Sequence, residues 1–193
     1  MSFEVLIITF YSYILGSIPF GLILTKFFLN EDLKNIGSGN IGATNVLRTG
    51  KKSLGAFTLL LDGIKAYAAI TITYNYLADY IYLSALVCFL GHIFPFWLKF
   101  KGGKGIAVFL GVLFTLSINY GLIFVVCWSI ILYLTKYSSL SSLISTGIIF
   151  LISIYFSSSS ESIFFFVILV IVIYTHRENI VRLKNKTENK INL

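Results

Sequence analysis

Long apolar runs recur along the whole chain and are separated by short polar stretches. A membrane-spanning helix needs about 20 apolar residues, and the last four runs fall short of that length. We therefore expect an all-α membrane protein. Two interpretations stay open, namely seven spans of which some are tilted or shallow, or five full spans with two partial ones. The predicted segments are roughly 3–29, 54–77, 80–98, 105–118, 120–135, 140–156 and 162–175.

The composition supports a membrane protein over a soluble one. Of 193 residues, 57% are hydrophobic and only 12% are charged, and the mean hydropathy is +0.88, values outside the range of ordinary soluble domains. Because no soluble linker-joined portion is visible, we expect residues 1–193 to form a single polytopic domain. The first run carries Glu4 instead of a basic region and has no small-residue cleavage site, which indicates a retained helix and not a signal peptide.

The distribution of charge predicts the topology. With seven spans, the loops on one side hold Glu4, Asp79 and Glu161 and no Lys or Arg, while the other side receives all fifteen basic residues. Lys26 and Lys65 reach that side by snorkelling in this interpretation. Since basic loops stay in the cytoplasm, the predicted N-terminus lies outside and the C-terminus lies in the cytoplasm.

The net charge of +7 has its simplest explanation in topology and in anionic lipid headgroups, because the basic residues flank apolar spans. Nucleic acid is therefore not an expected partner. Cys88 and Cys127 lie inside apolar stretches without metal-ligand spacing, and His92 and His176 are far apart in sequence. Neither a disulfide nor a metal site is predicted.

Three glycine-rich polar segments, 16–21, 37–45 and 101–105, lie on the basic side. Glycine exposes backbone N–H groups and Lys or Arg supplies positive charge, which together suit a phosphorylated ligand. The second segment fits G-x-G-x-x-G but lacks the preceding strand of a dinucleotide site, and the third is not a Walker A loop. The alternative is a flexible loop that attracts lipid. Candidate ligands of phosphate are Gly37, Ser38, Gly39, Asn40, Thr44, Asn45, Arg48, Gly102, Gly103 and Lys104.

Pro19 interrupts the first apolar run, between Gly16 and Gly21. Proline removes a helical hydrogen bond, and the two glycines allow neighbouring helices to approach closely. A packed kink is the favoured interpretation, and such a kink can also shape a groove for an acyl chain. Asp62 and Lys65 are three residues apart, so they share a helix face and we expect a structural ion pair.

Further polar residues stand out near the ends of later helices. His92 is an intramembrane histidine, for which packing and substrate binding are equally supported. His176 and Asn179 are three residues apart on one predicted helix face, where the last helix leaves the membrane. Ser139 and Ser142 belong to a serine-rich stretch that opens the sixth segment, where they suit either a helix cap or an anion. In the predicted topology, the basic loops and the His176 face all lie at one surface.

In this order, the motifs resemble those of the bacterial acyl-phosphate-dependent glycerol-3-phosphate acyltransferases, an integral membrane family. The similarity covers nearly the whole chain, and its blocks at 37–49 and 59–65 are highly specific. Ile41, Lys99 and Val108 depart from the commonest pattern without removing a candidate polar group. The matching blocks are GSIPFG at 16–21, GSGNIGATNVLRT at 37–49, LLLDGIK at 59–65, GHIFPFW at 91–97, FKGGKGIA at 100–107 and HRENIVRL at 176–183.

The resemblance implies a compact bundle of about seven transmembrane helices in the bacterial cytoplasmic membrane, with the active site facing the cytosol. It implies transfer of an acyl group from acyl phosphate to the 1-hydroxyl of glycerol 3-phosphate, the first acylation step of phospholipid synthesis. The products are 1-acylglycerol 3-phosphate (lysophosphatidic acid) and inorganic phosphate. No metal, cofactor, acyl-CoA or acyl carrier protein is expected at the site, and a soluble enzyme that produces acyl phosphate is an expected functional partner.

This chemistry agrees with the residues. Acyl phosphate is already activated, so the enzyme must chiefly bring two polyanions together and stabilise a tetrahedral intermediate. No nucleophilic Ser or Cys with a paired base is visible, which favours direct attack by the acceptor hydroxyl. The expected catalytic residues are His176, Asn179, Lys104, Arg48 and Ser38. The expected substrate-binding residues are Gly37, Gly39, Asn40, Thr44, Asn45, Gly102, Gly103, Ser139, Ser142 and His92.

Two other functions fit the composition less well. A transporter of a phosphorylated solute would have its site at the bilayer midplane, with internal repeats and broken helices, whereas these polar groups crowd one face. A purely structural lipid-binding protein leaves the glycine-rich basic loops unexplained. Release of phosphate from acyl phosphate and glycerol 3-phosphate by purified protein separates these possibilities.

Overall fold

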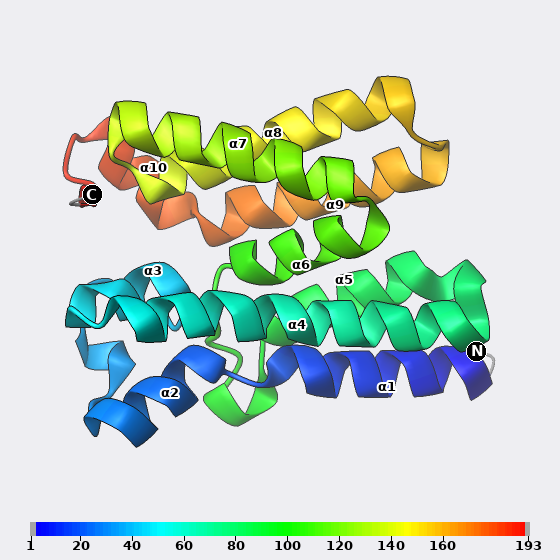
Figure 1. The fold of residues 1–193 in the computed structure, drawn as a ribbon, viewed down its shortest axis with the longest axis horizontal. Coiled ribbons are helices and arrows are strands. Elements are labelled where there is room, and N and C mark those ends of the chain that lie inside the picture. The colour runs from blue at the N-terminus through cyan, green and yellow to red at the C-terminus, as the bar shows by residue number, and fades with distance from the viewer. Residues whose placement is uncertain (1–2, 192–193) are drawn as a thin grey trace. The chain divides into compact units, whose positions relative to one another are not determined.

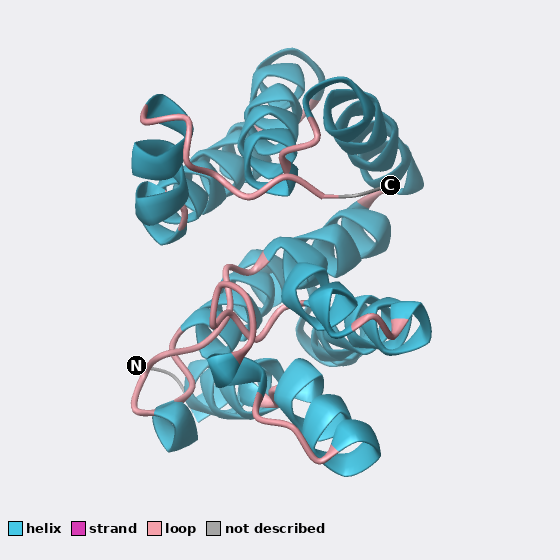
Figure 2. Ribbon diagram, turned by 90° about the vertical axis from the view of Figure 1, so that its left-hand side faces the viewer, coloured by secondary structure: helices cyan, strands magenta, loops and turns pink. Residues whose placement is uncertain are grey.

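The structure, a computed structural model, describes residues 3–191, and within this range it contains helices and loops but no strand (Figures 1 and 2). The predicted all-α fold is confirmed. Short 3-10 turns lie at Leu33–Asn35, Leu47–Thr49, Ala78–Tyr80 and Phe96–Leu98. The helices are α1 Phe3–Ser17, α2 Phe20–Leu29, α3 Ala43–Val46, α4 Lys52–Leu77, α5 Ile81–Ile93, α6 Ile106–Leu116, α7 Ile118–Thr135, α8 Ser138–Phe156, α9 Ser159–Thr175 and α10 Arg177–Lys184.

Each of the seven predicted apolar segments corresponds to a helix, with α1 and α2 together forming the first. By length and composition, four helical stretches in the described part of the chain can cross a membrane, or five if α9 and α10 count as one span. One of the four, Lys52–Leu98, contains both α4 and α5. Large apolar side chains such as Phe10 and Tyr155 are mostly exposed, as lipid-facing helices require.

The chain divides into two compact units, Met1–Thr115 and Leu116–Leu193, and the prediction of a single domain stays a prediction. In the first unit α1 packs against α4 and α5. Close approach depends on small residues, since a β-carbon added at Gly16 would lie 2.1 Å from the Cys88 carbonyl oxygen. In the same way, a β-carbon at Gly111 would lie 2.3 Å from the Gly63 carbonyl oxygen. Small residues at helix interfaces are typical of membrane bundles.

The predicted break at Pro19 is confirmed. Helix α1 ends at Ser17 and α2 begins at Phe20, because proline has no N–H to continue the ladder. Two carbonyl groups at the end of α1 are satisfied by side chains instead. The Ser17 carbonyl accepts a hydrogen bond from Trp97 Nε1 at 2.8 Å, and the Ile18 carbonyl accepts one from Lys65 Nζ at 2.8 Å.

In the second unit α8 packs against both α7 and α9, and α10 contacts α8 and α9. Helices α9 and α10 are bent by 61° at His176. The bend lies at His176, which is the cap residue of α10, while Asn179 lies inside α10, and the shared helix face of these two residues stays a prediction. The helix ladder of α9 ends at Thr175, and His176 caps it before α10 starts in a new direction.

Candidate active site

The loop that joins the 3-10 turn Leu33–Asn35 to α3 is organised by Asn45, a buried residue with 2% exposure. Asn45 Oδ1 accepts hydrogen bonds from the backbone N–H of Ser38 at 3.0 Å and from the Ser38 hydroxyl at 3.3 Å. Its Nδ2 donates to the carbonyls of Leu33 and Ile36 at 3.2 and 2.8 Å. Asn45 therefore holds the loop closed with both ends of its amide, while its predicted contact with substrate stays a prediction.

Arg48 lies over this loop. Its Nη1 donates to Asn45 Oδ1 at 3.4 Å, and a β-carbon at Gly37 would lie 2.6 Å from Arg48 Cδ. Gly37 has a φ of +53°, which glycine adopts without strain. The structure thus brings together four of the predicted site residues, Gly37, Ser38, Asn45 and Arg48.

Most backbone N–H groups of this loop already have acceptors. Ser38 N–H donates to Asn45, Gly39 N–H to the Ile36 carbonyl at 2.9 Å, and Gly42 N–H to Asn40 Oδ1 at 2.9 Å. In the sequence interpretation, the loop exposes N–H groups to a phosphate. These three N–H groups instead donate to acceptors inside the protein. Positive charge at this loop comes from the half-buried Arg48 side chain.

In the second glycine-rich loop, Lys101–Gly105, backbone N–H groups also donate to acceptors inside the protein. Gly102 N–H donates to the Ile93 carbonyl at 2.9 Å, and Gly103 N–H donates to the His92 carbonyl at 3.0 Å. Both glycines lie against the end of α5, because a β-carbon at Gly102 would lie 2.1 Å from the His92 carbonyl oxygen. The half-buried Lys104 comes next, separated by Gly105 from α6, whose first N–H groups have no partner inside the helix.

His92 is buried with 3% exposure and is not isolated. Its Nδ1 lies 2.9 Å from Lys65 Nζ, and Lys65 Nζ lies 2.7 Å from Asp62 Oδ1. The predicted Asp62–Lys65 pair is confirmed. The snorkelling of Lys65 to the basic side is wrong, because the residue is only 3% exposed and its ammonium donates to the Ile18 carbonyl and to Asp62. Sequence reasoning did not join His92 to Lys65, since 27 residues separate them and no spacing rule connects two helices.

His176 and Asn179 are both buried, at 3% and 5% exposure. His176 Nδ1 lies 2.9 Å from the Val172 carbonyl oxygen. A carbonyl can only accept, so Nδ1 carries the proton and, in the neutral ring, Nε2 is the basic nitrogen. This tautomer suits a residue that accepts a proton through Nε2.

Asn179 belongs to a polar cluster that was not predicted. Asn179 Nδ2, Ser139 Oγ and Arg182 Nε all donate to the carboxylate of Glu188, at 2.5, 2.7 and 2.7 Å. Burial alone raises the pKa of Glu188, but these three donors and the Arg182 charge outweigh it and hold the pKa below its usual value. The cluster brings Ser139 and Asn179 together around an anion. The one available sequence signal was an acidic residue inside a basic tail.

The remaining predicted residues have other surroundings. Ser142 Oγ donates to the Ser138 carbonyl at 2.9 Å and accepts from Trp128 Nε1 at 3.1 Å, so it lies on the α7–α8 interface. Thr44 is half-buried in α3. Within residues 3–191, no group of three or more His, Cys, Asp or Glu side chains can hold a metal ion.

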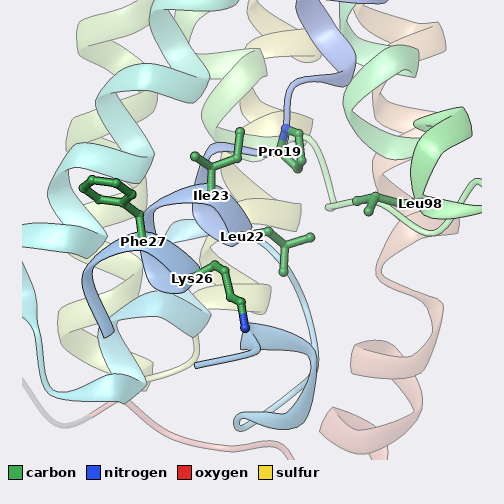
Figure 3. A pocket seen from close by; sticks show the side chains of 6 residues that line it. All are labelled: Pro19, Leu22, Ile23, Lys26, Phe27 and Leu98. Atoms are coloured by element: carbon green, nitrogen blue, oxygen red, sulfur yellow. The ribbon is translucent and has the colours of Figure 1, made fainter. Parts of the chain in front are cut away.

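An apolar groove of about 620 Å³ lies beside the Pro19 break. Figure 3 shows Pro19, Leu22, Ile23 and Phe27 around it, with Leu98 on the other side and the Lys26 side chain at one end. Its volume is within the range of about 300–1,000 Å³ typical of ligand sites. A groove that is apolar along its length and cationic at one end suits an amphiphile with an anionic head.

Comparison with known proteins identifies the family. The glycerol-3-phosphate acyltransferase family model matches residues 6–186. The chain belongs to the glycerol-3-phosphate acyltransferase family. A glycerol-3-phosphate acyltransferase of Pelagibacter ubique is 53% identical over 97% of both chains, and one of Rhodopseudomonas palustris is 51% identical over 93% of this chain and 92% of its own length. The protein is thus an acyltransferase, and the predicted family is confirmed.

Solved structures agree with the sequence comparison. The crystal structure of PlsY, an integral membrane glycerol 3-phosphate acyltransferase, in its glycerol 3-phosphate form is 35% identical and covers 97% of this chain and 96% of its own, with a TM-score of 0.92. The lysophosphatidic acid form of that enzyme gives a TM-score of 0.89 at 34% identity, with coverage of 97% and 95%. The chain is therefore a multi-pass membrane acyltransferase of this fold.

Proposed function

We propose that this protein transfers an acyl group from acyl phosphate to the 1-hydroxyl of glycerol 3-phosphate. The ester bond forms as the acyl–phosphate bond breaks, and the products are 1-acylglycerol 3-phosphate and inorganic phosphate. The similarity to the glycerol 3-phosphate form of a family member, over 97% of the chain, carries the acceptor assignment. The donor assignment rests on the resemblance of the motifs to the acyl-phosphate-dependent family, and the basic side chains of the chain agree with a substrate that is already activated.

Arg48 and Lys104 are the proposed ligands of the substrate phosphates. Because the N–H groups of Gly39, Gly42, Gly102 and Gly103 are used inside the protein, side-chain cations supply the attraction for two polyanions. The fixed guanidinium of Arg48 offers a bidentate fork, and the Lys104 ammonium offers a point charge. Ser38, which the loop holds beside Arg48, adds a hydroxyl to the same phosphate site.

The groove beside Pro19 is the proposed site of the acyl chain. Its lining is apolar except for Lys26, so the chain lies among Leu22, Ile23 and Phe27 while the phosphate stays near a cation. Burial of methylene groups contributes about 0.8 kcal/mol each, which favours a long acyl chain over a short one at this site.

His176 is the proposed general base, with Asn179 beside the acceptor. The hydrogen bond from Nδ1 to Val172 favours a ring whose Nε2 takes the hydroxyl proton as the carbon–oxygen bond forms. Asn179 orients the hydroxyl or donates to the oxyanion of the intermediate. In the competing route a substrate phosphate takes the proton and His176 only donates a hydrogen bond.

The active site is proposed to face the cytosol of a bacterial cytoplasmic membrane, because the loops that carry Arg48 and Lys104 belong to the basic side. There the enzyme meets water-soluble glycerol 3-phosphate and a donor made by a soluble enzyme that produces acyl phosphate.

The test uses purified protein in detergent. With acyl phosphate and glycerol 3-phosphate together, we expect release of inorganic phosphate and formation of 1-acylglycerol 3-phosphate in equal amounts. Acyl-CoA in place of acyl phosphate is the matched control and should give no product. Activity with acyl-CoA alone would reject the proposed donor, and transport of glycerol 3-phosphate into vesicles without product would reject the enzyme.

A further inference from the structure

The buried ions of the first unit form one connected cluster. Lys65 Nζ donates to Asp62 Oδ1 at 2.7 Å, to the Ile18 carbonyl at 2.8 Å and to His92 Nδ1 at 2.9 Å. An ammonium has three hydrogens and no acceptor, so all three are used and His92 Nδ1 must be the acceptor. The proton of the neutral His92 ring is therefore on Nε2.

Nε2 points toward the second glycine-rich loop. A β-carbon at Gly103 would lie 2.1 Å from His92 Nε2, so Gly103 rests directly on the edge of the imidazole ring. The backbone makes the same contact, because the N–H groups of Gly103 and Gly102 donate to the carbonyls of His92 and Ile93. A change in the orientation of the His92 ring would thus displace Gly103 and the adjacent Lys104.

Lys65 also reaches the break in the first apolar segment. The Ile18 carbonyl belongs to the end of α1, where the helix has its negative pole and where Pro19 leaves carbonyls without helical partners. The Phe20 ring lies 5.8 Å from Lys65 Nζ, which adds a cation–π contact. One side chain on α4 therefore ties the glycine-rich segment 16–21 to the histidine that supports the loop 101–105.

Stabilisation of the fold does not by itself explain why this cluster of ions is buried. Asp62, Lys65 and His92 are at most 3% exposed, and Asp62 Oδ2 has no hydrogen-bond partner among the described residues. Removing charges from water costs several kcal/mol per ion, and apolar residues of equal volume are often at least as stable. The hydrogen bonds of the cluster instead fix orientations. Asp62 and the Ile18 carbonyl orient the Lys65 ammonium, and Lys65 orients the His92 ring.

We propose that Lys65, with Asp62 as its counter-ion, is a positioning residue for the loop Lys101–Gly105 and acts through His92. The sequence of contacts runs from the Ile18 carbonyl and Asp62 through Lys65 to the His92 ring, then to Gly103 and Lys104. The inference rests on the proposed function insofar as Lys104 binds a substrate phosphate. Lys65 itself touches no substrate in this scheme.

The test replaces the ion pair as a unit. Changing Lys65 alone would leave Asp62 as an unpaired buried charge and would endanger folding, so the variant combines Asp62→Asn with Lys65→Met. We expect this variant to fold, and we expect the KM of one substrate to rise about tenfold, the factor for one lost hydrogen bond of roughly 1.4 kcal/mol, at little change in kcat. That substrate must be the one whose KM rises in Lys104→Ala.

Two further variants keep the result specific. Thr73→Val removes a part-buried hydrogen bond between Tyr11 and Thr73, elsewhere on α4, so it should lower the melting temperature and leave both KM values unchanged. His92→Phe should reproduce the rise in KM, and its combination with the paired variant should add nothing further, because contacting residues in one network are not additive. His92→Phe also supplies the test if the paired variant does not fold.

Hydrogen exchange separates this inference from the proposed function. The amides of Gly102 and Gly103 should exchange faster in the paired variant than in the wild type and Thr73→Val, whatever the substrates are. Unchanged exchange, an unchanged KM, or additive effects of His92→Phe would each overturn the positioning role. Faster exchange in an enzyme that gives no product from acyl phosphate would leave the positioning role standing and reject the proposed function.

Discussion

At the scale of single residues, two glycines are required by a neighbouring side chain. Gly37 leaves room for the Arg48 chain, and Gly103 leaves room for the His92 ring. The N–H groups of Gly39 and Gly42 donate to acceptors within the first loop, and those of Gly102 and Gly103 donate to the end of α5. The glycines therefore allow cations and an imidazole to come close to the loop, and the charge that attracts a phosphate belongs to side chains.

Arg48→Ala and Lys104→Ala should each lower kcat/KM by roughly 10- to 150-fold, because a hydrogen bond to a charged group contributes about 1.5–3 kcal/mol. Arg48→Lys should restore activity only in part, since an ammonium cannot replace a bidentate fork. Steady-state kinetics with both substrates measure this. Lys51→Ala is the control, because it removes the same charge from an exposed neighbour and should change little. Near-normal kinetics in both Ala variants would reject the phosphate site.

His176→Ala should abolish most turnover and remove a limb of the pH–rate profile near neutral pH, where imidazole titrates. The physical reason is the tautomer, because the Nδ1 proton on the Val172 carbonyl leaves Nε2 as the basic atom. Rates of His176→Ala and Asn179→Ala are measured across pH. Lost turnover with an unchanged profile would favour proton transfer to a substrate phosphate, and full activity in both variants would remove these residues from the active site.

Sequence reasoning identified the residues of the candidate site more readily than their roles. Arg48, Ser38 and Asn45 lie close together in sequence, so local spacing was enough to group them. The link from Lys65 to His92, and from Asn179 to Glu188, joins separate elements through the fold. The sequence interpretation exposed the glycine N–H groups to substrate, whereas those of Gly39, Gly42, Gly102 and Gly103 donate inside the protein. Whether an amide is exposed depends on which acceptors the fold brings close to it, and the amino-acid composition does not show this.

At the scale of elements, small residues set how closely the helices approach. Gly16 on α1 lies against the backbone of α5, and Gly21 on α2 lies against the Ile41 carbonyl, where a β-carbon would be 2.0 Å away. In the serine-rich helix α8, the hydroxyls of Ser141 and Ser142 donate to backbone carbonyls one turn earlier, those of Tyr137 and Ser138. At Gly16 and Gly21 the neighbouring segments therefore meet through direct backbone contact.

Gly16→Ala should destabilise the protein by about 1–3 kcal/mol, the usual cost of overpacking, since the new methyl group meets the Cys88 carbonyl. Gly147→Ala is the matched control. Gly147 lies in α8 with no atom within 4 Å of an added β-carbon, so alanine should gain up to about 1 kcal/mol from helix propensity. Thermal unfolding in detergent compares the two. Equal melting temperatures would contradict the close α1–α5 contact.

The C-terminal tail should be held in a pH-dependent way. The pKa of Glu188 is lowered in the folded state, so its contribution to stability is complete above the ordinary glutamate pKa of about 4.3 and is lost as the pH falls through the lowered pKa. Glu188→Gln should cost about 1–3 kcal/mol at neutral pH and less in acid, as measured by thermal unfolding against pH.

Glu178→Gln is the control for the tail. Glu178 also faces Arg182, at 3.9 Å, but its side chain is 74% exposed, and exposed pairs contribute little. The same pH dependence in both variants would show that Arg182 alone, and not the cluster with Ser139 and Asn179, holds Glu188.

At the scale of the whole molecule, the fold follows closely from the apolar pattern. All seven predicted segments contain helices, because an apolar run in lipid must satisfy its backbone internally. The break at Pro19 divides the first segment, and the break at His176 comes directly after the last one. The first was predicted since proline forces it, whereas His176-Arg177 carries no residue that requires a bend, so the sequence could not indicate it.

The orientation in the membrane should follow the basic residues. A single cysteine at Lys101 should react with an impermeant thiol reagent in inverted vesicles and not in intact cells, because Lys101 is exposed and belongs to the side that carries the Lys and Arg residues. The control is a cysteine at Asp79, on the predicted outer side, with the opposite expectation. Labelling at Lys101 in intact cells would reverse the topology.

The inward-turned amides of the two glycine-rich loops have a thermodynamic consequence. A loop that must order around its ligand loses conformational entropy when the ligand arrives, which weakens binding. Here the loops are fastened to Asn45 and to the end of α5 during folding, so that entropy is lost before any substrate is present. Glycerol 3-phosphate is small and can make few contacts. Because the loops are already ordered, the free energy of those contacts would contribute to binding without being offset by the entropy cost of ordering a loop.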